Sequence, residues 1–456
     1  MKVVIIGGGA SGLMAGIQAA RAGASVTILE KCDKPGKKIL ATGNGRCNLT
    51  NQKQELSAYH GDQKFVQSVL SSFSMKDTLD FFHELGLWTK ERDGWIYPRS
   101  DSAASVLQLL LLEFTRLKGK LKTREEVTAI RLNRGIVSRK ANIREEAGVP
   151  LLNEPSAKQR PAEERFTVFT KSWQYDADAV IVACGTPASN IEGVSSDALT
   201  LAKSFGLKTK EFRPSLVSLK CTREHYFAKW AGVRVQAVLD LICDGAVLQT
   251  ETGELQLTDY GISGIPVFQL SSKAGELLEQ GRKPSVRINF LPEFSQTEAE
   301  SAGCASGSID SAFDESAQNR IPLEAQKRIP LEASLSKVAE QNPGKTPEQL
   351  LTGLLPEKLI DALSGKKMTL EQLLDRLSCC DVRIASTGPL RQAQICAGGV
   401  LLTELTHELE AKNISGLYFT GECTDLDGRC GGYNLQWAWS TGAAAGRAAA
   451  VHGSNK

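Results

Sequence analysis

The sequence predicts an α/β fold in which one domain, built from the two ends of the chain, is interrupted by a second domain. Three observations lead to this prediction. Short apolar runs alternate with helical patterns over the first hundred residues, as they do in βαβ units. The same style returns after about residue 391. Between these parts, from about 191 to 389, β-type runs give way to helical patterns, which indicates a separate unit.

The chain opens with a strand, a helix and a second strand. Residues 3–6 form an apolar run that predicts a buried strand, residues 11–22 predict a helix of small residues, and residues 25–29 predict the second strand. Two strands joined by one short helix predict a parallel pair with a right-handed crossover. Further β-type segments follow at 127–132, 166–170 and 179–183.

The inserted region is expected to contain strands and then helices. β-type runs lie at 233–242 and 286–290, and leucines at helical spacing over 350–377 predict a helical lobe with its own core. After the insertion, residues 417–420 predict a strand and residues 434–450 an Ala-rich helix.

Three further stretches fall between these elements. Residues 138–165 are charged and predict a protruding hairpin or a mobile loop, and the Ser-, Ala-, Glu- and Gly-rich residues 295–320 predict a flexible loop. The sequence IPLEA occurs at 321–325 and again at 329–333. Two copies are too few for a repeat protein, so we interpret them as a local duplication.

Composition restricts the kinds of partner. A chain of 456 residues predicts two or three domains. Its net charge of +2 creates no field that would draw a nucleic acid or an anionic membrane, so we expect a small-molecule partner and neither of those. The opening apolar run is short and ends in glycines, and no run reaches the roughly 18 to 20 residues of a membrane span. We therefore expect a cytoplasmic protein.

Eleven cysteines are an odd number, and their spacing contains no paired CxxC element that would hold zinc. We therefore expect reduced, mostly buried thiols and no metal site.

The first motif with a chemical meaning is VVIIGGGASG, which follows the first predicted strand and opens a helix. Gly7 permits a tight turn, Gly9 lets a pyrophosphate approach the backbone, and Gly12 allows the helix to pack closely on the strand. Glu30 ends the second strand about 20 residues later, where a carboxylate accepts hydrogen bonds from the adenosine ribose. A carboxylate there disfavours a 2′-phosphate, which leaves NAD or FAD.

The C-terminal pattern favours FAD. A predicted strand ends at Gly421 and leads into an acidic loop, from which we expect Asp425 to reach the ribityl hydroxyls of a flavin. GGYNLQWAWSTG then opens a helix whose N-terminus is expected to point at the flavin N1 and C2 carbonyl, where it would stabilise negative charge. The alternative is that Gly431 and Gly432 only cap and pack that helix.

The strand AVIVACG, residues 179–185, ends at a small-residue turn. In flavoproteins of this kind the chain crosses near the cofactor at such a turn before it enters the second domain, and Cys184 stands where a threonine is usual. Cys423 and Cys430 flank the acidic loop and raise the hypothesis of a redox dithiol, with buried structural thiols as the alternative.

Four longer strings are far rarer than a glycine motif, and on them the chain resembles the bacterial flavoproteins described as aminoacetone oxidase-like or BaiN-like NAD(P)/FAD-dependent oxidoreductases. The resemblance covers nearly the whole chain. The strings are GKKILATGNGRCNLTN at 36–51, IYPRSDSAASVL at 96–107, LTDYGISGIPVFQLSS at 257–272 and GGYNLQWAWSTG at 431–442.

The resemblance implies a two-dinucleotide-binding-type (Rossmann-like) FAD domain interrupted by an insert with a small β-barrel and a helical lobe. The domains would be 1–190 and 390–456 for FAD binding and 191–389 for the insert, with the lobe at roughly 295–378. Two departures concern the substrate pocket: several glycines are missing from CGTPASNIEGVSSDA at 184–198, and Asp259 replaces an expected histidine.

The resemblance also implies that residues 36–48 run beside the flavin. Together with the motifs, it gives the following expected cofactor-binding residues: Gly7, Gly9, Ala10, Ser11, Gly12, Glu30, Lys31, Lys37, Asn44, Arg46, Val127, Ala183, Gly185, Gly421, Glu422, Asp425, Gly432, Tyr433, Asn434 and Leu435.

The expected function is that of an FAD-dependent oxidoreductase that acts on a small organic substrate by hydride transfer at flavin N5, with NAD(P)H as a transient electron donor. Family members are linked to the oxidation of amino-ketones and to the reduction of conjugated double bonds in steroid-like acids. Substrate, direction, choice of NADH or NADPH and oligomeric state stay open. Tyr260 is a candidate proton donor or a packed turn residue.

Two other functions are alternatives to an oxidoreductase. A non-catalytic flavin-binding redox regulator would use flavin reduction to shift the insert. A flavoprotein acting on RNA is disfavoured, because the sequence contains no basic stripe with interleaved aromatic residues.

Overall fold

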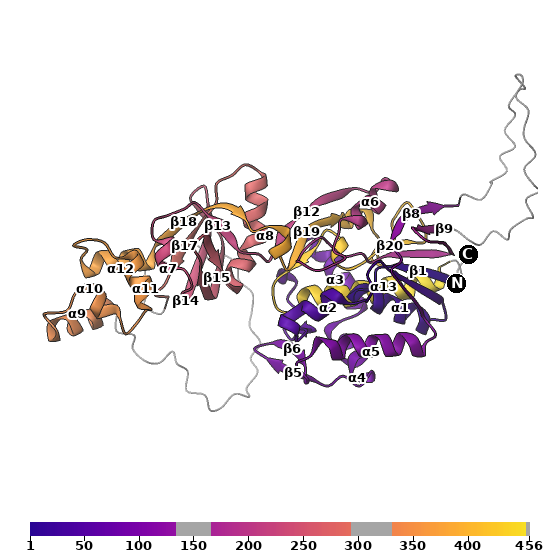
Figure 1. Cartoon of the computed structure of the whole chain (residues 1–456), viewed down its shortest axis with the longest axis horizontal. Coiled ribbons are helices and arrows are strands. Elements are labelled where there is room, and N and C mark those ends of the chain that lie inside the picture. Colours follow the sequence, from indigo (N-terminus) through magenta and orange to yellow (C-terminus); the bar gives the residue numbers. More distant parts are fainter. Residues whose placement is uncertain (134–165, 293–330, 453–456) are drawn as a thin grey trace, which may run out of the picture. The chain divides into compact units, whose positions relative to one another are not determined.

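The computed structural model describes residues 1–133, 166–292 and 331–452. The chain forms two compact units, Met1–Leu216 with Pro389–Lys456, and Val217–Gly388 (Figure 1). The sequence placed the start of the insertion at 191. The second unit begins later because α6 (Asp197–Ser204) and β12 (Thr209–Ser215) belong to the first unit, where β12 pairs with β19 (Ile395–Val400).

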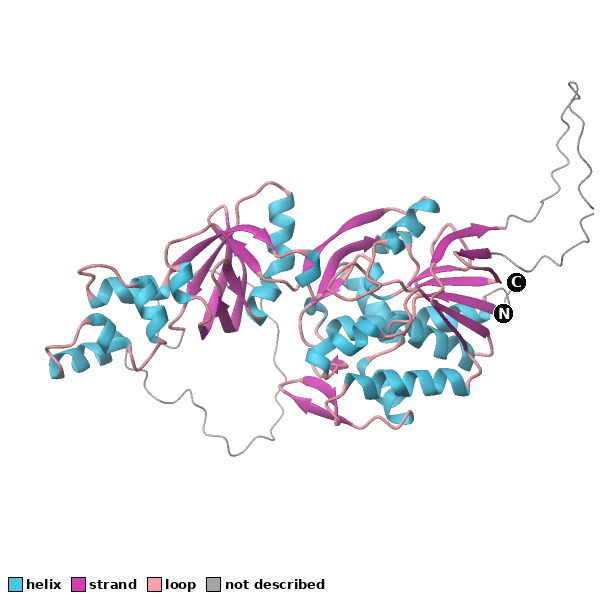
Figure 2. Cartoon of the chain, viewed as in Figure 1, coloured by secondary structure: helices cyan, strands magenta, loops and turns pink. Residues whose placement is uncertain are grey.

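A parallel sheet forms the centre of the first unit, and both ends of the chain contribute strands to it. Its strand order is β20-β11-β1-β2-β7, and every neighbouring pair is parallel. Its strands are among those drawn in magenta in Figure 2. The predicted strands at 3–6, 25–29, 179–183 and 417–420 are confirmed. The strands are β1 (Lys2–Ile6), β2 (Ser25–Glu30), β7 (Lys120–Thr123), β11 (Ala179–Val182) and β20 (Leu417–Phe419).

The sheet is buried because its central strands are apolar along their length. All four residues of β11 and four of the five residues of β1 are buried, the pattern of a parallel strand covered on both faces. The predicted helices are α1 (Ala10–Arg21) and α13 (Tyr433–Val451), which pack along each other.

Glycines allow α1 and α13 to approach closely. A Cβ atom on Gly442 would lie 2.5 Å from the carbonyl oxygen of Ser11, and one on Gly446 would lie 2.4 Å from that of Ala15. The last helix of the chain is therefore fitted against the first.

The remaining elements of the first unit surround this core. The antiparallel sheet β10-β9-β8 contains the predicted strands at 127–132 and 166–170. The helices and strands of the first unit that surround the parallel sheet are α2 (Lys37–Ala41), β3 (Thr50–Asn51), β4 (Tyr59–His60), α3 (Gln63–Ser72), α4 (Met75–Glu84), β5 (Thr89–Arg92), β6 (Trp95–Pro98), α5 (Ala103–Arg116), β8 (Val127–Leu132), β9 (Phe166–Thr170), β10 (Gln174–Ala177) and β21 (Asp427–Gly428).

The second unit contains a closed barrel with strand order β13-β16-β15-β14-β17-β18 and a helical lobe, as the family resemblance implied. Its hydrophobic core is separate from that of the first unit. The strands are β13 (Leu219–Cys221), β14 (Arg234–Cys243), β15 (Ala246–Leu257), β16 (Gly261–Ser263), β17 (Ser285–Asn289) and β18 (Cys380–Thr387); the helices are α7 (Phe227–Trp230), α8 (Ile265–Glu279), α9 (Leu331–Gln341), α10 (Pro347–Leu351), α11 (Glu357–Leu363) and α12 (Leu370–Ser378).

Some sequence predictions fall outside the described residues. These are the loops at 138–165 and 295–320 and the first IPLEA copy, whereas the second copy ends in the first turn of α9. Within the described residues, no helix combines the length and the apolar character that crossing a bilayer requires. In the same parts of the chain, no group of three His, Cys, Asp or Glu side chains could hold a metal ion.

Candidate functional site

The glycine motif after β1 forms a tight turn between β1 and α1. Gly7 has a φ of 107°, and a Cβ atom there would lie 2.4 Å from the carbonyl oxygen of Ala183 at the end of β11. A Cβ atom on Gly12 would lie 2.0 Å from the carbonyl oxygen of Gly7. Neither position can carry a side chain, which agrees with the roles expected for these two glycines.

Gly9 differs from these two glycines. It is the N-cap of α1, and no protein atom lies within 4 Å of the position that its Cβ would occupy. No side chain caps the helix, and its first turn contains no acidic residue. The first-turn N–H groups, from Ala10 and Ser11 onward, therefore form a cradle that suits a phosphate.

Glu30 is fixed beside this turn. Its Oε2 accepts a hydrogen bond from the Gly8 N–H at 2.8 Å, and its Oε1 accepts one from the Cys32 N–H at 2.8 Å. Each carboxylate oxygen keeps a lone pair for a further donor such as a ribose hydroxyl. The Glu125 N–H donates to the Glu30 carbonyl at 2.9 Å, which brings the chain just before Val127 to the end of β2.

The turn after β20 packs directly on the first turn of α1. Gly421 has a φ of 71°, and its Cβ would lie 2.6 Å from Ser11 Oγ. The next residue, Glu422, accepts a hydrogen bond from Thr186 Oγ1 at 3.0 Å and pairs with the Lys38 ammonium. Three distant segments therefore meet at the carboxyl edge of the parallel sheet.

Asp425 lies in a different environment. Its carboxylate pairs with Lys210 Nζ at 2.7 Å, and its N–H donates to the Val400 carbonyl at 2.8 Å. These contacts tie Asp425 to β12 and β19, while Glu422 is the acidic residue that lies beside the glycine turn.

The predicted lysines are already paired with acids. Lys31 Nζ contacts Asp197 Oδ2 at 2.8 Å, and Lys37 Nζ contacts Asp33 Oδ1 at 2.7 Å and Glu192 Oε2 at 2.6 Å. The hydrogen bonds that Lys37 donates, to Asp33 first and then to Glu192, raise the pKa of Lys37. Glu192 and Asp197 belong to residues 184–198, the stretch that lacks the glycines expected from the family. Their carboxylates neutralise the charges of Lys37 and Lys31.

The start of α13 is packed on the GRCNLTN segment. Gly432 has a φ of 94°, and its Cβ would lie 2.5 Å from the backbone of Thr50. The Cβ of Gly431 would lie 2.9 Å from the indole nitrogen of Trp95. The two glycines therefore do serve packing, and the helix N-terminus that they open carries no acidic residue in its first turn.

The residues of that first turn are held from both sides. Tyr433 Oη donates to the Lys53 carbonyl at 2.8 Å, and the Asn434 amide bonds to Gly428 through both of its ends, each at 2.8 Å. Leu435 is half-buried.

The loop before β3 is more open. Gly43 and Asn44 adopt left-handed conformations with φ of 56° and 54°, and the side chains of Asn44 and Arg46 are exposed. Gly185, after β11, has a φ of 70° and open space around its Cβ position. These residues are accessible to a ligand.

Sequence reasoning missed five site residues. Lys38 and Thr186 contact Glu422; the sequence marked them only as a second lysine in GKK and a threonine after the β11 turn. His60 and Ser215 both contact the buried carboxylate of Asp427, at 3.1 and 2.9 Å. His60 and Asp427 lie 367 positions apart, so no local pattern connects them.

The cysteine hypothesis receives no support from the geometry. Cys423 is buried and its thiol contacts the Val182 and Thr420 carbonyls, whereas the Cys430 thiol lies 3.9 Å from the Gln394 side chain. Burial raises the pKa of Cys423 to about 12, so its thiol is unreactive. The ten cysteines in the described parts are free thiols.

Tyr260 lies in the second unit, between β15 and β16. Its side chain is exposed, and its carbonyl accepts a hydrogen bond from the Cys221 N–H at 3.0 Å. Its role as a proton donor stays a prediction.

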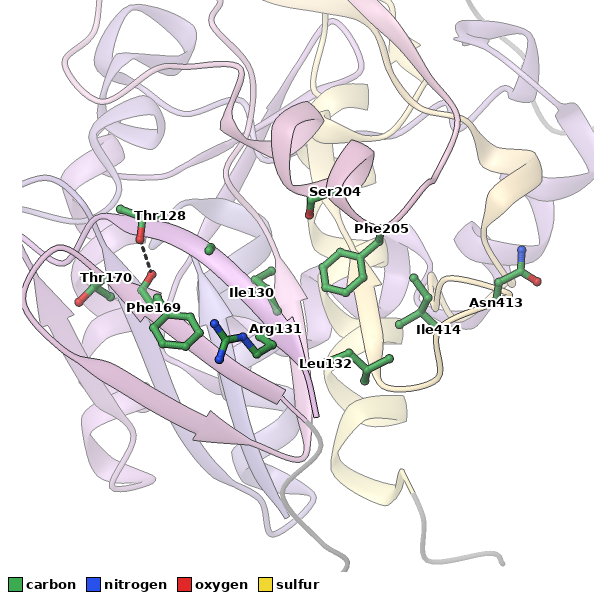
Figure 3. Close-up of a pocket in the computed structure, with 11 residues that line it drawn as sticks. Thr128, Ile130, Arg131, Leu132, Phe169, Thr170, Ser204, Phe205, Asn413 and Ile414 are labelled. Carbon is green, nitrogen blue, oxygen red and sulfur yellow. Dashed lines mark hydrogen bonds between the residues drawn. The ribbon is translucent and has the colours of Figure 1, made fainter. Parts of the chain in front are cut away.

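A pocket of about 890 Å³ lies elsewhere in the first unit (Figure 3). Asn413 and Ile414 line it just before β20, at the amino edge of the parallel sheet, opposite the glycine turns. Arg131 lies against the Phe169 ring, with its guanidinium carbon 5.0 Å from the ring centroid. This pocket is therefore distinct from the nucleotide edge.

Comparison with known proteins gives the family. The model described as the HI0933-like protein Rossmann domain matches residues 1–448, a span that includes α1 and the start of α13. The chain belongs to the HI0933-like family.

Two relatives match this HI0933-like protein over nearly its whole length. A 3-dehydro-bile acid delta(4,6)-reductase from Clostridium scindens is 41% identical and covers 98% of this chain and 99% of its own. A ribosomal RNA dihydrouridine synthase from Escherichia coli is 27% identical and covers 96% of this chain and 95% of its own. The match to the bile-acid reductase shows the BaiN-like part of the resemblance and not the aminoacetone oxidase-like part, so the chain is a BaiN-like FAD oxidoreductase.

Among solved structures, a 3-ketosteroid delta4-(5alpha)-dehydrogenase from Rhodococcus jostii is 14% identical, with a TM-score of 0.44 over 98% of this chain and 96% of that one. A 3-ketosteroid delta1-dehydrogenase from Sterolibacterium denitrificans is 10% identical, with a TM-score of 0.47 over 98% and 99%. Similarity at this level bears on neither substrate nor mechanism.

Proposed function

We propose that this HI0933-like protein is an FAD-dependent reductase of a carbon–carbon double bond conjugated to a carbonyl group, with a small steroid-like acid as substrate. The observation that carries the proposal is the 41% identity, over 98% of the chain, to a reductase of 3-dehydro-bile acids. A 3-oxo group next to a double bond at position 4 makes that bond electron-poor, which suits it to accept a hydride.

The two glycine turns supply the proposed FAD site. The N-terminus of α1 at Gly9 would hold the phosphates, and Glu30 would hold the adenosine ribose. For the ribityl hydroxyls we propose Glu422 in place of Asp425, because Glu422 directly follows Gly421, whose backbone packs on the first turn of α1, whereas Asp425 is tied to β12 and β19. Bound there, FAD supplies hydride transfer at its N5 atom.

The residues at the start of α13 would tune the flavin. The first-turn N–H groups of Tyr433, Asn434 and Leu435 carry the positive end of the helix dipole, and no acidic residue in that turn offsets it. A flavin edge placed there would have its negative charge stabilised on reduction.

The reaction also requires a proton. The hydride goes to the carbon farther from the carbonyl, and a proton must reach the carbon next to the carbonyl. Tyr260 is the proposed donor, because its side chain is exposed and a tyrosine hydroxyl can donate a proton.

We propose NAD(P)H as the electron donor. The sequence contains one full GxGxxG fingerprint, which the FAD site would use. A nicotinamide would therefore bind transiently at the flavin face and leave before the substrate enters.

A second substrate class has its own support. Two relatives, 27% and 24% identical over 96% of this chain, are ribosomal RNA dihydrouridine synthases, and a uracil ring also contains a double bond conjugated to a carbonyl. We favour the steroid-like acid because the identity to the bile-acid reductase is higher and because the net charge of +2 provides no strong attraction for RNA. A non-catalytic regulator is not favoured, because the full-length relatives are enzymes.

Anaerobic turnover tests the proposal. The protein is reduced with NADH or NADPH, and its flavin absorbance is followed after addition of a 3-oxo-4,6-diene bile acid, its saturated 3-oxo analogue, or uridine-containing ribosomal RNA. Repeated reoxidation by the diene alone is expected. Reoxidation by the RNA alone would transfer the function to the second class, and no turnover with either would contradict both.

A further inference from the structure

A buried carboxylate outside the proposed reaction connects three segments of the first unit. Asp427 in β21 has a side chain that is only 5% exposed. It accepts hydrogen bonds from Ser215 Oγ at 2.9 Å and from His60 Nδ1 at 3.1 Å. Burial of a carboxylate is costly unless it is paired, so these contacts are required for the local fold.

Serine, histidine and aspartate are also the components of a hydrolytic triad, but their arrangement here is different. The Ser215 hydroxyl and the His60 ring both bond to the same oxygen, Oδ2 of Asp427. In a hydrolase the histidine lies between the serine and the acid and takes the proton of the serine. The cluster therefore does not activate a nucleophile, and its role is to hold segments in place.

The segments that it holds lead to the start of α13. Asp427 is followed by Gly428, whose N–H and carbonyl both bond to the Asn434 side chain in the first turn of α13. Tyr59, next to His60 in β4, donates from its hydroxyl to the Tyr433 carbonyl at 3.3 Å. The two residues of β4 therefore support that turn, Tyr59 directly and His60 through Asp427.

The charges around His60 favour its protonated form. The His60 side chain is 37% exposed, and the desolvation of its buried part opposes the charged form; the hydrogen bond and the charge of Asp427 outweigh this, so the pKa of His60 is raised. The other charged groups that face it, Arg429 after β21 and Arg213 in β12, act in the opposite direction. The charge of the pair thus changes within the range where histidine titrates, near neutral pH.

We propose that His60 and Asp427 are positioning residues for the flavin, and that the charge on His60 determines how firmly the first turn of α13 is held against it. This inference rests on the proposed function, because it requires the flavin to lie at that turn. Loss of the charge on His60 leaves a hydrogen bond from the neutral imidazole to the Asp427 carboxylate, so the turn loosens without unfolding.

The sign of the pH effect follows from the direction of the shift. The pKa of His60 in the folded protein lies above its ordinary value of about 6.5, so the charged pair is fully present below about pH 6.5. Its contribution is lost as the pH rises through the raised pKa. FAD binding is therefore expected to weaken from mildly acidic to mildly alkaline pH.

The experiment measures the FAD dissociation constant of the full chain between about pH 6 and about pH 8.5 at constant ionic strength, by quenching of flavin fluorescence. The variants are His60→Gln, which keeps a hydrogen-bond donor and removes the charge, and Asp427→Asn. The matched control is His452→Gln at the opposite end of α13, where His452 lies 3.4 Å from Glu410. Melting temperatures of the apo-proteins show whether each variant folds.

For the wild type and His452→Gln, we expect the dissociation constant to rise about three- to tenfold over this range, since one pKa unit corresponds to tenfold. For His60→Gln and Asp427→Asn we expect a flat profile at the weak, high-pH level. The inference is overturned if His60→Gln keeps the wild-type profile or if His452→Gln also flattens it. If the wild type takes up no FAD at any pH, the proposed function itself fails.

Discussion

At the scale of single residues, the site depends on which atoms surround each motif position. Asp425 and Glu422 lie three positions apart and are both acidic, so the sequence could not decide between them; the structure pairs one with Lys210 and the other with Lys38. Lys37 was predicted from its place in the GKK string, but one of its two acidic partners, Glu192, lies 155 positions away. The motifs predicted the backbone turn at the start of α1. The partners of the charged side chains could not be predicted, because the tertiary fold determines them.

Replacement of Gly9 by alanine separates ligand binding from folding. The added methyl group meets no protein atom, so the apo-protein should lose only the roughly 1 kcal/mol or less that alanine costs relative to glycine at a helix N-cap, which lowers its melting temperature by a few degrees at most. It would project into the space that a pyrophosphate needs, so FAD binding should weaken by about tenfold or more. Calorimetry and FAD titration of the same preparation provide both values. Unchanged FAD affinity would exclude the phosphates from the α1 turn.

Glu422→Gln and Asp425→Asn form a matched pair for the ribityl contact. Loss of a charged hydrogen bond is worth about 1.5 to 3 kcal/mol, so Glu422→Gln should weaken FAD binding about tenfold or more. Asp425→Asn should change the FAD dissociation constant by less than about threefold, because substitutions outside a binding contact usually change a free energy by no more than about 0.5 kcal/mol. If equilibrium titrations show that Asp425→Asn weakens FAD binding more than Glu422→Gln does, Asp425 would be the ribityl ligand, as the sequence suggested.

At the scale of elements, the strands and helices were largely predictable because their patterns are local. The buried runs that became β1 and β11 and the Ala-rich stretch that became α13 were read from periodicity and composition. The start of the insertion was not predictable, because β12 belongs to the first unit through pairing with β19, nearly two hundred residues later. Strand pairing over such a separation leaves no local signal.

The seam between α1 and α13 gives a prediction at this scale. Gly446→Ala would place a Cβ atom 2.4 Å from the Ala15 carbonyl oxygen, a backbone atom that cannot move aside cheaply. We expect the free energy of unfolding to fall by about 1 to 3 kcal/mol, as for overpacking of a core. The control is Gly344→Ala, because a Cβ atom there meets open space and Gly344 does not have a positive φ. This variant should change the free energy of unfolding little. Equal effects of Gly446→Ala and Gly344→Ala in urea unfolding would contradict the close approach of the two helices.

At the scale of the whole molecule, the two ends of the chain build one nucleotide-binding unit around a long insertion. β20 completes the sheet beside β11, Gly421 contacts Ser11, and α13 packs along α1. The family resemblance predicted this architecture and the barrel of the insert. Substrate choice could not be predicted, because relatives of similar coverage are named for a bile acid and for ribosomal RNA.

The most direct test of the central claim is an equilibrium titration of the apo-protein with FAD, carried out for the wild type and for one variant at each end of the chain, Gly9→Ala and Glu422→Gln. We predict one FAD per wild-type chain and weaker binding for both variants, because both ends contact the same nucleotide. A wild-type protein that binds no FAD, or a variant at either end that binds it as the wild type does, would contradict the claim.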